Sequence, residues 1–555
     1  MPSMRSLGER APTGNAWTGV IGTGLALKLR KRVRLLSDLE HWSTHAQRIQ
    51  TQQLRTLLTL AQRTEVGRQA GFTKLLRLDD AALLRDYRKS LPLADYEQYR
   101  AQLARTRENA EPDVCWPGVV MDWAQTSGTT GGEKYIPVSK QMMRSNYIAA
   151  LDIFAHAIRR GLPLKNLFGG KMLFLGGTTQ VTTNEHGIRT GDLSGLVTPL
   201  IRWPLSQVYT PGKDIALLSD WPTKIQKIAE LCIDQDVRFV SGMSSWSLLL
   251  FEQLVETASK ATGGKASTLQ EIWPNFQMFI HGGVRYPPFD PRVRTAWSGN
   301  PQDDVPYRLE VYPASEGFIA VQDEANPPDG APSPLRLHTD IGVFYEFVPA
   351  EEIHDPDARS FTVGEVETGQ RYVVVMSTCA GLWRYVIGDV VVFDSAPGPK
   401  GTGGVPRLRI VGRHKHFINA FGENLIVGQI ENAVVAARDA TGLDIGEFTA
   451  SPIYPTETTR GGLELVIELD RPDAPLEAFG KRFDESLKAQ NVDYTTKRGE
   501  SFGMTPPRVT PVPMGLFSDW MASRGKLGGQ NKVPRCANHR DFVNGLREMA
   551  GLNTE

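Results

Sequence analysis

The segment from Thr126 to Lys134 has the sequence Thr-Ser-Gly-Thr-Thr-Gly-Gly-Glu-Lys, which suits a polyphosphate. Its three glycines let the backbone turn tightly and approach a ligand closely, and its four hydroxyl side chains supply hydrogen-bond donors. Lys134 adds a cation that can compensate phosphate charge. The segment is not a Walker A loop, because Glu133 separates Gly132 from Lys134. A flexible surface loop has a similar composition and is the alternative.

A second candidate segment, Tyr312–Glu316, begins at the end of an apolar stretch that we predict to be a strand. The ends of strands are where α/β sheets place ligand-binding groups. There the tyrosine could stack on a purine, and the carboxylate could hold Mg²⁺ beside phosphates. A turn with a solvated glutamate is the alternative.

A third segment, Trp383–Val390, ends its apolar approach in Gly388 and Asp389. An aspartate in this position can accept hydrogen bonds from both hydroxyls of a ribose. The alternative is an ordinary Gly-Asp turn before a strand at Val390–Phe393.

A fourth segment, Ser523–Arg535, places glycines around Lys526 and Lys532. Such a loop could present an ammonium group to a reacting oxyanion. A solvated basic loop is the alternative.

These segments require a framework, and hydrophobic periodicity predicts one. Residues 35–103 have helical spacing and predict a helical N-terminal layer. Beyond Trp123, short apolar runs alternate with helical stretches, which indicates an α/β architecture with helix-covered sheets. The predicted strands are Lys171–Gly176, Arg238–Val240, Phe276–Ile280 and Leu309–Tyr312, and the predicted helices are Ser139–Ile158 and Ser245–Ser259.

The pattern changes after Arg413, where a smaller α+β part begins. It contains predicted helices at Glu431–Arg438 and Leu476–Gln490 and a predicted strand at Leu463–Leu469. We therefore expect two domains, residues 1–413 and 414–555. Segments rich in Pro and Gly predict a surface loop at Asn326–Pro334 and a hairpin or connection at Ala396–Pro406.

Composition limits the partners. At 555 residues the chain exceeds the size of one hydrophobic core. Lys plus Arg and Asp plus Glu both total 62, so the net charge predicts neither nucleic acid nor an anionic membrane as partner.

The apolar run Trp17–Leu29 is too short to span a bilayer, and the basic residues follow it instead of preceding it as in a signal peptide. We therefore interpret it as the start of a helix and expect a cytoplasmic protein. The cysteines are widely spaced, which favours buried thiols over a metal site: Cys115, Cys232, Cys379 and Cys536.

The order of the four segments resembles the superfamily of adenylate-forming enzymes, which includes acyl-CoA synthetases, luciferases and peptide-synthetase adenylation domains. The Tyr-Pro-Ala-Ser-Glu pattern at Tyr312–Glu316 and the ending Ser523–Cys536 are more specific. They resemble the Gretchen Hagen family of acyl acid–amido synthetases, found in plants and bacteria. The resemblance implies a large N-terminal adenylate-forming domain and a smaller C-terminal lid that carries a mobile lysine. It also implies that ATP and Mg²⁺ adenylate a carboxylic acid, which then forms an amide with an amino acid or another amine.

The resemblance also implies a role for each matching residue. Glu316 would hold Mg²⁺, Asp389 the ribose, and Lys532 would be the catalytic lysine that reaches the α-phosphate, with Lys526 as its competitor. Ser315 and Arg413 would contribute to the nucleotide site. The residues expected around the phosphates are Thr126, Ser127, Gly128, Thr129, Thr130 and Lys134, and those expected around the adenine are Gly282, Gly283 and Tyr312.

The sequence departs from the family pattern in two places. Val386 replaces an arginine expected before Gly-Asp, and Lys415, His416 and Asn419 stand in the hinge region where the superfamily has an acidic residue and a lysine. The acyl-acid pocket is assigned only by analogy. Its expected lining suits a ring-bearing or apolar acid, although aromatic residues at helical spacing are also typical of plain core: Met143, Tyr147, Ser241 and Trp246.

Two other functions stay open. An acid–CoA ligase would use the same adenylation half-reaction, and a catalytically inactive homologue would only bind nucleotide. In each case we expect small-molecule partners and a monomer or weak homodimer.

Overall fold

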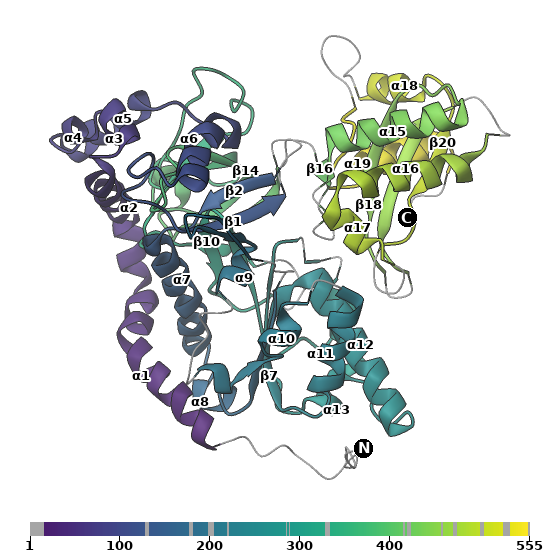
Figure 1. The fold of residues 1–555 in the computed structure, drawn as a ribbon, viewed down its shortest axis with the longest axis horizontal. Helices are drawn as coiled ribbons and strands as arrows, with labels where there is room; N and C mark the ends of the chain where they lie inside the picture. Colours follow the sequence, from purple (N-terminus) through teal and green to yellow (C-terminus); the bar gives the residue numbers. More distant parts are fainter. Residues whose placement is uncertain are drawn as a thin grey trace. The chain divides into compact units, whose positions relative to one another are not determined.

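The computed structural model describes most of the chain and divides it into two units, which we describe separately (Figure 1). The first unit comprises Met1–Thr126, Lys134–Gly283 and Arg294–His414, and the second comprises Ser127–Glu133, Val284–Val293 and Lys415–Glu555. The described residues are 16–127, 133–176, 181–197, 205–218, 221–284, 286–287, 289–327, 333–413, 417–418, 423, 425–456, 459–469, 474–499, 504–524 and 533–552.

The N-terminal part of the first unit is helical, as predicted. Its helices are α1 Ala16–Ser37, α2 Leu39–Ala61, α3 Glu65–Gln69, α4 Phe72–Leu75, α5 Asp80–Ser90 and α6 Tyr96–Asn109. Polar side chains begin several of them: Asp38, Thr64 and Asp79 each accept a hydrogen bond from a first-turn N–H, and Asp95 forms a capping box with Gln98. The apolar run at the N-terminus is therefore part of a helix.

The centre of the first unit is one sheet of 11 strands, in the order β12-β13-β14-β15-β11-β10-β9-β8-β7-β3-β6. The strands from β9 to β6 are parallel to their neighbours, and those from β9 to β12 are antiparallel. The parallel part contains β3 Lys171–Leu175, β6 Tyr209–Thr210, β7 Val237–Met243, β8 Met278–Gly282 and β9 Tyr307–Ala314. The antiparallel part adds β10 Gly317–Gln322, β11 Leu335–Leu337, β12 Val343–Pro349, β13 Arg371–Thr378, β14 Tyr385–Ser395 and β15 Arg407–Arg413.

Helices cover the parallel part of this sheet on both faces. On one face, Ile153 and Ala157 of α7 pack with Leu309 and Val311 of β9 in one buried cluster. On the other face, Phe251 of α12 stacks edge-on against Phe279, with ring centroids 5.4 Å apart. The helices that follow the N-terminal layer are α7 Lys140–Arg159, α8 Leu164–Leu167, α9 Leu193–Val197, α10 Lys213–Ala216, α11 Trp221–Cys232, α12 Ser244–Thr262, α13 Leu269–Ile272 and α14 Asp290–Ser298.

A second, four-stranded sheet flanks the expected phosphate loop, in the order β2-β1-β5-β4. Thr126 lies near the end of β1 and Lys134 near the start of β2, so two paired strands carry the two ends of that loop. Its strands are β1 Asp122–Ser127, β2 Glu133–Pro137, β4 Thr182–Thr183 and β5 Arg189–Gly191.

The second unit contains the sheet β18-β19-β20, with β18 antiparallel and β20 parallel to β19. Val466 and Val512 of this sheet pack with Phe517, Trp520 and other apolar residues. The strands are β18 Phe448–Ile453, β19 Gly462–Glu468 and β20 Arg508–Val512, with the short pair β16 Phe417–Ile418 and β17 Leu425–Ile426. The helices are α15 Val427–Thr441, α16 Leu476–Gln490, α17 Val492–Lys497, α18 Leu516–Ser523 and α19 Asp541–Met549.

The sequence predicted these elements well. The α/β class, the four strands, the two long helices and the elements of the α+β part are confirmed, and the helix Leu476–Gln490 has the predicted bounds. The connection predicted at Ala396–Pro406 joins the antiparallel strands β14 and β15 and contains a short 3-10 helix, η3 Pro399–Gly401. A second 3-10 helix, η2, spans Leu205–Gln207.

The four cysteines are all free and buried, as expected of structural thiols. Burial raises the pKa of each thiol to about 12. Among the described residues, no helix combines enough length and apolarity to cross a bilayer.

A buried carboxylate supports the second unit. Glu464 of β19 is fully buried, and its oxygens contact Arg540 at 2.6 Å, Arg508 at 2.9 Å and Arg547 at 2.5 Å. Burial raises the pKa of Glu464, but the hydrogen bonds from Thr510 and Arg540 and the arginine charges outweigh it and lower the pKa to about 2. Against the ordinary value of 4.5, this lowering corresponds to about 3 kcal/mol of stability.

The sign of this effect gives a pH prediction. A carboxylate with a lowered pKa stabilises the fold above the unfolded value and loses that contribution as the pH falls from about 4.5 towards 2. Glu464→Gln should therefore unfold at a lower temperature than the natural chain at neutral pH, because three arginines lose their counter-charge. Calorimetry should show this gap narrowing on acidification, and a gap that stays constant down to pH 3 would contradict the assignment.

Candidate active site

A buried hydrogen bond joins two of the four sequence segments. The hydroxyl of Tyr312 on β9 donates to Oδ2 of Asp389 on β14 at 2.5 Å, across a separation of 77 residues. Both side chains are buried, with 5% and 6% of their surfaces exposed. Burial, and then the charge of Asp389, raises the pKa of Tyr312 well above its usual range, so the tyrosine is a neutral donor.

Arg413 is the third member of this group. It forms an ion pair with Oδ1 of Asp389, and the two residues lie opposite each other on β15 and β14. Burial disfavours the charge on Arg413, but Asp389, Tyr312 and Glu316 outweigh it and raise the pKa of the guanidinium. Arg413, the last residue of β15, therefore interacts electrostatically with both Asp389 and Glu316.

Asp389 does not lie in a turn, so the alternative of a Gly-Asp turn before Val390 is wrong. β14 runs from Tyr385 to Ser395 and contains the Gly388–Asp389 pair. Gly388 has φ +98°, a value that glycine adopts without the steric cost of a side chain. An ionised carboxylate has about four acceptor sites, so Asp389 can still accept ribose hydroxyls beside Tyr312 and Arg413.

Glu316 lies between β9 and β10, beside Ser315, and is buried with 9% of its surface exposed. Burial raises the pKa of this carboxyl, while the charge of Lys134, a hydrogen bond from Tyr385 and the charge of Arg413 act in the opposite direction. Charges on β2 and β15 and a hydrogen bond from β14 therefore favour the ionised form of Glu316 against the effect of burial. Tyr385 was not identified from the sequence, although it belongs to the segment Trp383–Val390.

Lys134 lies at the start of β2 against the N-terminal helical layer. Its ammonium group is 5.8 Å from the centre of the Tyr96 ring, and the Tyr96 hydroxyl accepts a hydrogen bond from the backbone N–H of Tyr135 at 2.9 Å. The first residue of α6 thus supports the strand that leaves the expected phosphate loop. Tyr96 is a further residue that the sequence reasoning missed.

Gly282 is the last residue of the parallel strand β8 and lies opposite Val311 of β9, and Gly283 follows it. A Cβ at Gly282 would lie 2.3 Å from the carbonyl oxygen of Val311, so no side chain fits there. Gly283 is exposed and has φ +83°. The backbone therefore has no side chains at the carboxyl end of β8, opposite the residue that precedes Tyr312. A planar base could approach the backbone closely there.

The four residues expected around the acid occupy two places. Ser241 and Trp246 lie at the end of β7 and the start of α12, next to β8. Met143 and Tyr147 lie on α7, where Met143 packs against the core of the helical layer. The Tyr147 ring is half exposed, and its hydroxyl accepts a hydrogen bond from Lys28 at 3.3 Å, an outer-surface position that is not expected of a pocket residue.

Several candidates lie outside the described residues or have undescribed side chains. These are Ser127, Gly128, Thr129, Thr130, Lys415, His416, Asn419, Lys526 and Lys532.

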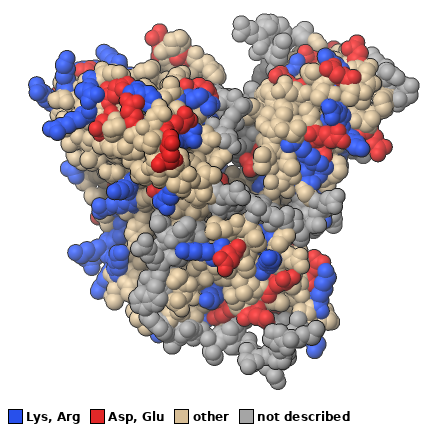
Figure 2. Space-filling view, viewed as in Figure 1, with Lys and Arg blue, Asp and Glu red and all other residues tan. Residues whose placement is uncertain are grey.

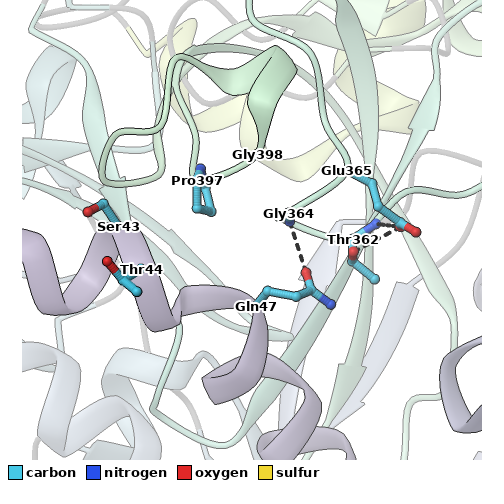
Figure 3. A pocket seen from close by; sticks show the side chains of 8 residues that line it. All are labelled: Ser43, Thr44, Gln47, Thr362, Gly364, Glu365, Pro397 and Gly398. Carbon is cyan, nitrogen blue, oxygen red and sulfur yellow. Dashed lines mark hydrogen bonds between the residues drawn. The ribbon is translucent and has the colours of Figure 1, made fainter. Parts of the chain in front are cut away.

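A cavity of about 470 Å³ in the first unit is separate from all the predicted site residues (Figure 3). It lies between α2 and two loops, and Gly364 N–H donates to Gln47 Oε1 at 2.9 Å at its edge. Its lining residues are Ser43, Thr44, Gln47, Thr362, Gly364, Glu365, Pro397 and Gly398. The candidate site is therefore the Tyr312–Glu316–Asp389–Arg413 group and not this cavity.

The side chains of the candidate site suit a metal ion that binds together with a nucleotide. Among the described residues, no three His, Cys, Asp or Glu side chains are grouped to hold a metal ion. Mg²⁺ commonly takes one or two carboxylates and completes its coordination with phosphate oxygens and water. Glu316, a buried carboxyl whose ionised form the charges of Lys134 and Arg413 favour, is suited to that role.

Three family models match the chain in order: the GH3 family N-terminal domain over residues 35–210, the central domain over 337–413 and the C-terminal domain over 428–541. The chain belongs to the GH3 family. This is the Gretchen Hagen family that the sequence motifs resemble.

The curated relatives within this family are distant, and two of them match over nearly their full length. An indole-3-acetic acid-amido synthetase of Arabidopsis thaliana is 21% identical over 91% of this chain and 92% of its own length. Another, from Oryza sativa subsp. indica, is 22% identical over 95% of each chain. A jasmonoyl–L-amino acid synthetase of Oryza sativa subsp. japonica is 27% identical over 63% of this chain and 55% of its own length.

Solved structures share the fold. The GH3.15 acyl acid amido synthetase has a TM-score of 0.53 at 18% identity and covers 93% of this chain and 95% of its own. A 2-hydroxyisobutyryl-CoA ligase, in complex with 2-HIB-AMP and CoA, has a TM-score of 0.50 at 14% identity and covers 90% and 91%. These two proteins thus share the fold of this chain.

The role of Asp389 can be tested through nucleotide binding. If Asp389 accepts the ribose hydroxyls, Asp389→Ala leaves them unpaired in a desolvated site, which costs on the order of 1–3 kcal/mol of ATP affinity. Asp394→Ala is the control, because Asp394 is on the same strand and also forms an ion pair with an arginine of β15, Arg409, but is exposed. Calorimetry should show weaker ATP binding for the first variant only, and equal affinities would refute the ribose role.

Proposed function

We propose that this protein uses ATP to convert a carboxylic acid into an acyl-adenylate and then transfers the acyl group to the amine of an amino acid, releasing AMP. It would then be a ligase that forms carbon–nitrogen bonds. The observation that carries the proposal is the convergence of Tyr312, Asp389, Arg413 and Glu316 in a chain of the GH3 family. The curated relatives with printed activities are amido synthetases, which supports amide formation as the second step.

In the first step, a carboxylate oxygen of the acid attacks the α-phosphorus, and the bond to the leaving pyrophosphate breaks. Asp389 would hold the ribose, the bare backbone at Gly282 and Gly283 would receive the adenine beside Tyr312, and Lys134 would face the phosphates. Mg²⁺ held by Glu316 would neutralise charge on the phosphate oxygens. Lys532 would stabilise the charge that develops at the α-phosphate as pyrophosphate leaves.

In the second step, the amine nitrogen attacks the acyl carbon, the bond to the phosphate oxygen breaks, and AMP leaves. The amine proton is lost to solvent or to a nearby base. We propose that the second unit works as a lid, so that Lys532 acts in the first step and moves away in the second.

We propose an apolar or ring-bearing acid as substrate. Ser241 and Trp246 support a pocket here, because Ser241 lies near the carboxyl end of β7, next to the strand that ends in Gly282, and Trp246 lies at the start of α12, where its ring would suit an apolar acid. Ligands of open α/β sheets bind at this edge. Met143 would complete the pocket from α7.

An acid–CoA ligase is the second candidate, because the 2-hydroxyisobutyryl-CoA ligase shares the fold and holds an acyl-AMP. We further propose that the protein acts in the cytoplasm as a monomer or weak homodimer. Its four free, buried thiols fit a reducing compartment.

ATP–pyrophosphate exchange tests the first step without knowledge of the amine. A panel of apolar and aromatic carboxylic acids should contain at least one that makes radioactive pyrophosphate enter ATP. Exchange should need both the acid and Mg²⁺. Nucleotide binding without exchange for any acid would indicate the catalytically inactive homologue instead.

A further inference from the structure

The outer helices of the first unit carry charge of one sign. Although the whole chain has zero formal charge, α1, α7 and α8 contain nine basic residues and one acidic residue, Asp152. Asp152 is fully buried and bound by Arg32 at 2.5 Å, so it does not reach the surface. Every exposed charge on these helices is therefore positive, and the residues are Lys28, Arg30, Lys31, Arg34, Lys140, Arg144 and Lys165.

Helix α1 presents these charges on a fixed face. Gly22 packs so closely on α8 that a Cβ would lie 2.2 Å from the carbonyl oxygen of Leu164, and Leu29 and Leu36 are buried. The opposite side is exposed and contains, at helical spacing, Val20, Leu27, Lys31 and Arg34. Figure 2 shows Lys and Arg side chains projecting at the left edge, where Figure 1 places α1.

The exposed face is apolar in its first half and basic in its second. Val20 and Leu27 expose 61% and 66% of their surfaces, values that are high for branched apolar side chains on a packed helix. Lys31 and Arg34 have no salt-bridge partner among the residues that the structure describes. This helix of 22 residues is about 33 Å long, so the face is extended.

We propose that this face, the exposed side of α1 with the neighbouring cations of α7 and α8, binds a membrane surface that contains anionic lipid. Lysine and arginine attract phosphate headgroups, and leucine and valine can enter the boundary between headgroups and acyl chains. The apolar residues favour lipid over nucleic acid, whose backbone offers the cations phosphates but offers Leu27 nothing apolar to enter. Net charge alone concealed this surface, because the balancing acidic residues lie on other elements.

Vesicle co-sedimentation of the full-length chain tests the proposal. The natural chain should pellet with phosphatidylcholine vesicles that contain phosphatidylglycerol, should not pellet with phosphatidylcholine alone, and should be released by salt. Neutralising two charges in Lys31→Gln/Arg34→Gln should lower partitioning about 25-fold, at about fivefold for each charge. Leu27→Ser should lower it as well, without changing the net charge.

The control is Lys481→Gln/Arg482→Gln, which removes two exposed charges from α16 in the second unit. It should partition as the natural chain does, and all variants should keep the natural unfolding temperature. Equal losses in both double variants would mean that partitioning follows net charge and would overturn the proposal. Binding to double-stranded DNA without binding to anionic vesicles would overturn it too, as would partitioning unaffected by Leu27→Ser.

Discussion

Lys532→Ala should lower the rate of acyl-adenylate formation by about 10²–10³. Adenylation builds negative charge at the α-phosphate as pyrophosphate leaves, and a placed ammonium group stabilises that charge in a site with little water. Loss of one such donor typically costs a factor of this size. The measurement is ATP–pyrophosphate exchange with the best acid of the panel.

The same variant should behave differently in the second half-reaction. If Lys532 lies on a lid that moves away after adenylation, Lys532→Ala should still convert prepared acyl-adenylate and amino acid into amide at a near-normal rate. Lys526→Ala is the matched control, a nearby lysine whose loss should have a much milder effect in both assays. Equal losses in the two half-reactions would reject the moving lysine, and a larger effect at Lys526 would show that it is the catalytic one.

Glu316→Gln should reduce adenylation by orders of magnitude while leaving the fold intact. The substitution keeps the size of the side chain and removes the charge that would bind Mg²⁺. Raising the Mg²⁺ concentration should restore the rate only in part, because an amide oxygen is a weaker ligand than a carboxylate. Titration of exchange activity against Mg²⁺ measures both effects.

Glu310 supplies the control for this experiment, since it lies on β9, six residues before Glu316. Burial raises the pKa of Glu310 to about 7, so its carboxyl already carries a proton part of the time at neutral pH. Glu310→Gln should therefore leave the Mg²⁺ dependence of exchange unchanged. Full activity of Glu316→Gln at low Mg²⁺ would show that Glu316 is not the metal ligand.

The sequence predicted local structure better than it predicted contacts. Helical and strand periodicities act over a few residues, so elements such as Leu476–Gln490 and Lys171–Leu175 could be located from the chain alone. The bond between Tyr312 and Asp389 joins β9 and β14, which the strand order of the 11-stranded sheet separates by β15, β11 and β10. No short-range pattern specifies that order.

The nature of the Gly388–Asp389 pair shows the same limit. Gly-Asp is common in turns, and a turn was an alternative interpretation of the sequence. The pair lies instead inside a strand of 11 residues. The cross-strand partner Arg413 and the acceptance of the Tyr312 hydrogen bond hold Asp389 there. Tyr385 was missed for a related reason, because a tyrosine in an apolar stretch resembles core until its neighbours are known. Tyr96 was missed because it stands between Asp95 and Glu97 in a polar stretch that contains no recognisable motif.

The distribution of charge over the surface could not be predicted from the composition either. Equal numbers of acidic and basic residues gave a net charge of zero, but the exposed charges of α1, α7 and α8 are all basic, and Glu464 forms ion pairs with three arginines inside the second unit. The distribution of charge depends on which helix faces are buried.

The central claim, amide formation through an acyl-adenylate, is tested most directly by following AMP and product together. The enzyme is incubated with ATP, Mg²⁺ and the acid that supports pyrophosphate exchange, with either a mixture of amino acids or CoA added. We predict AMP release that depends on an amino acid, with the matching N-acyl amino acid detected by mass spectrometry. AMP release that depends on CoA, with an acyl thioester as product, would contradict the account.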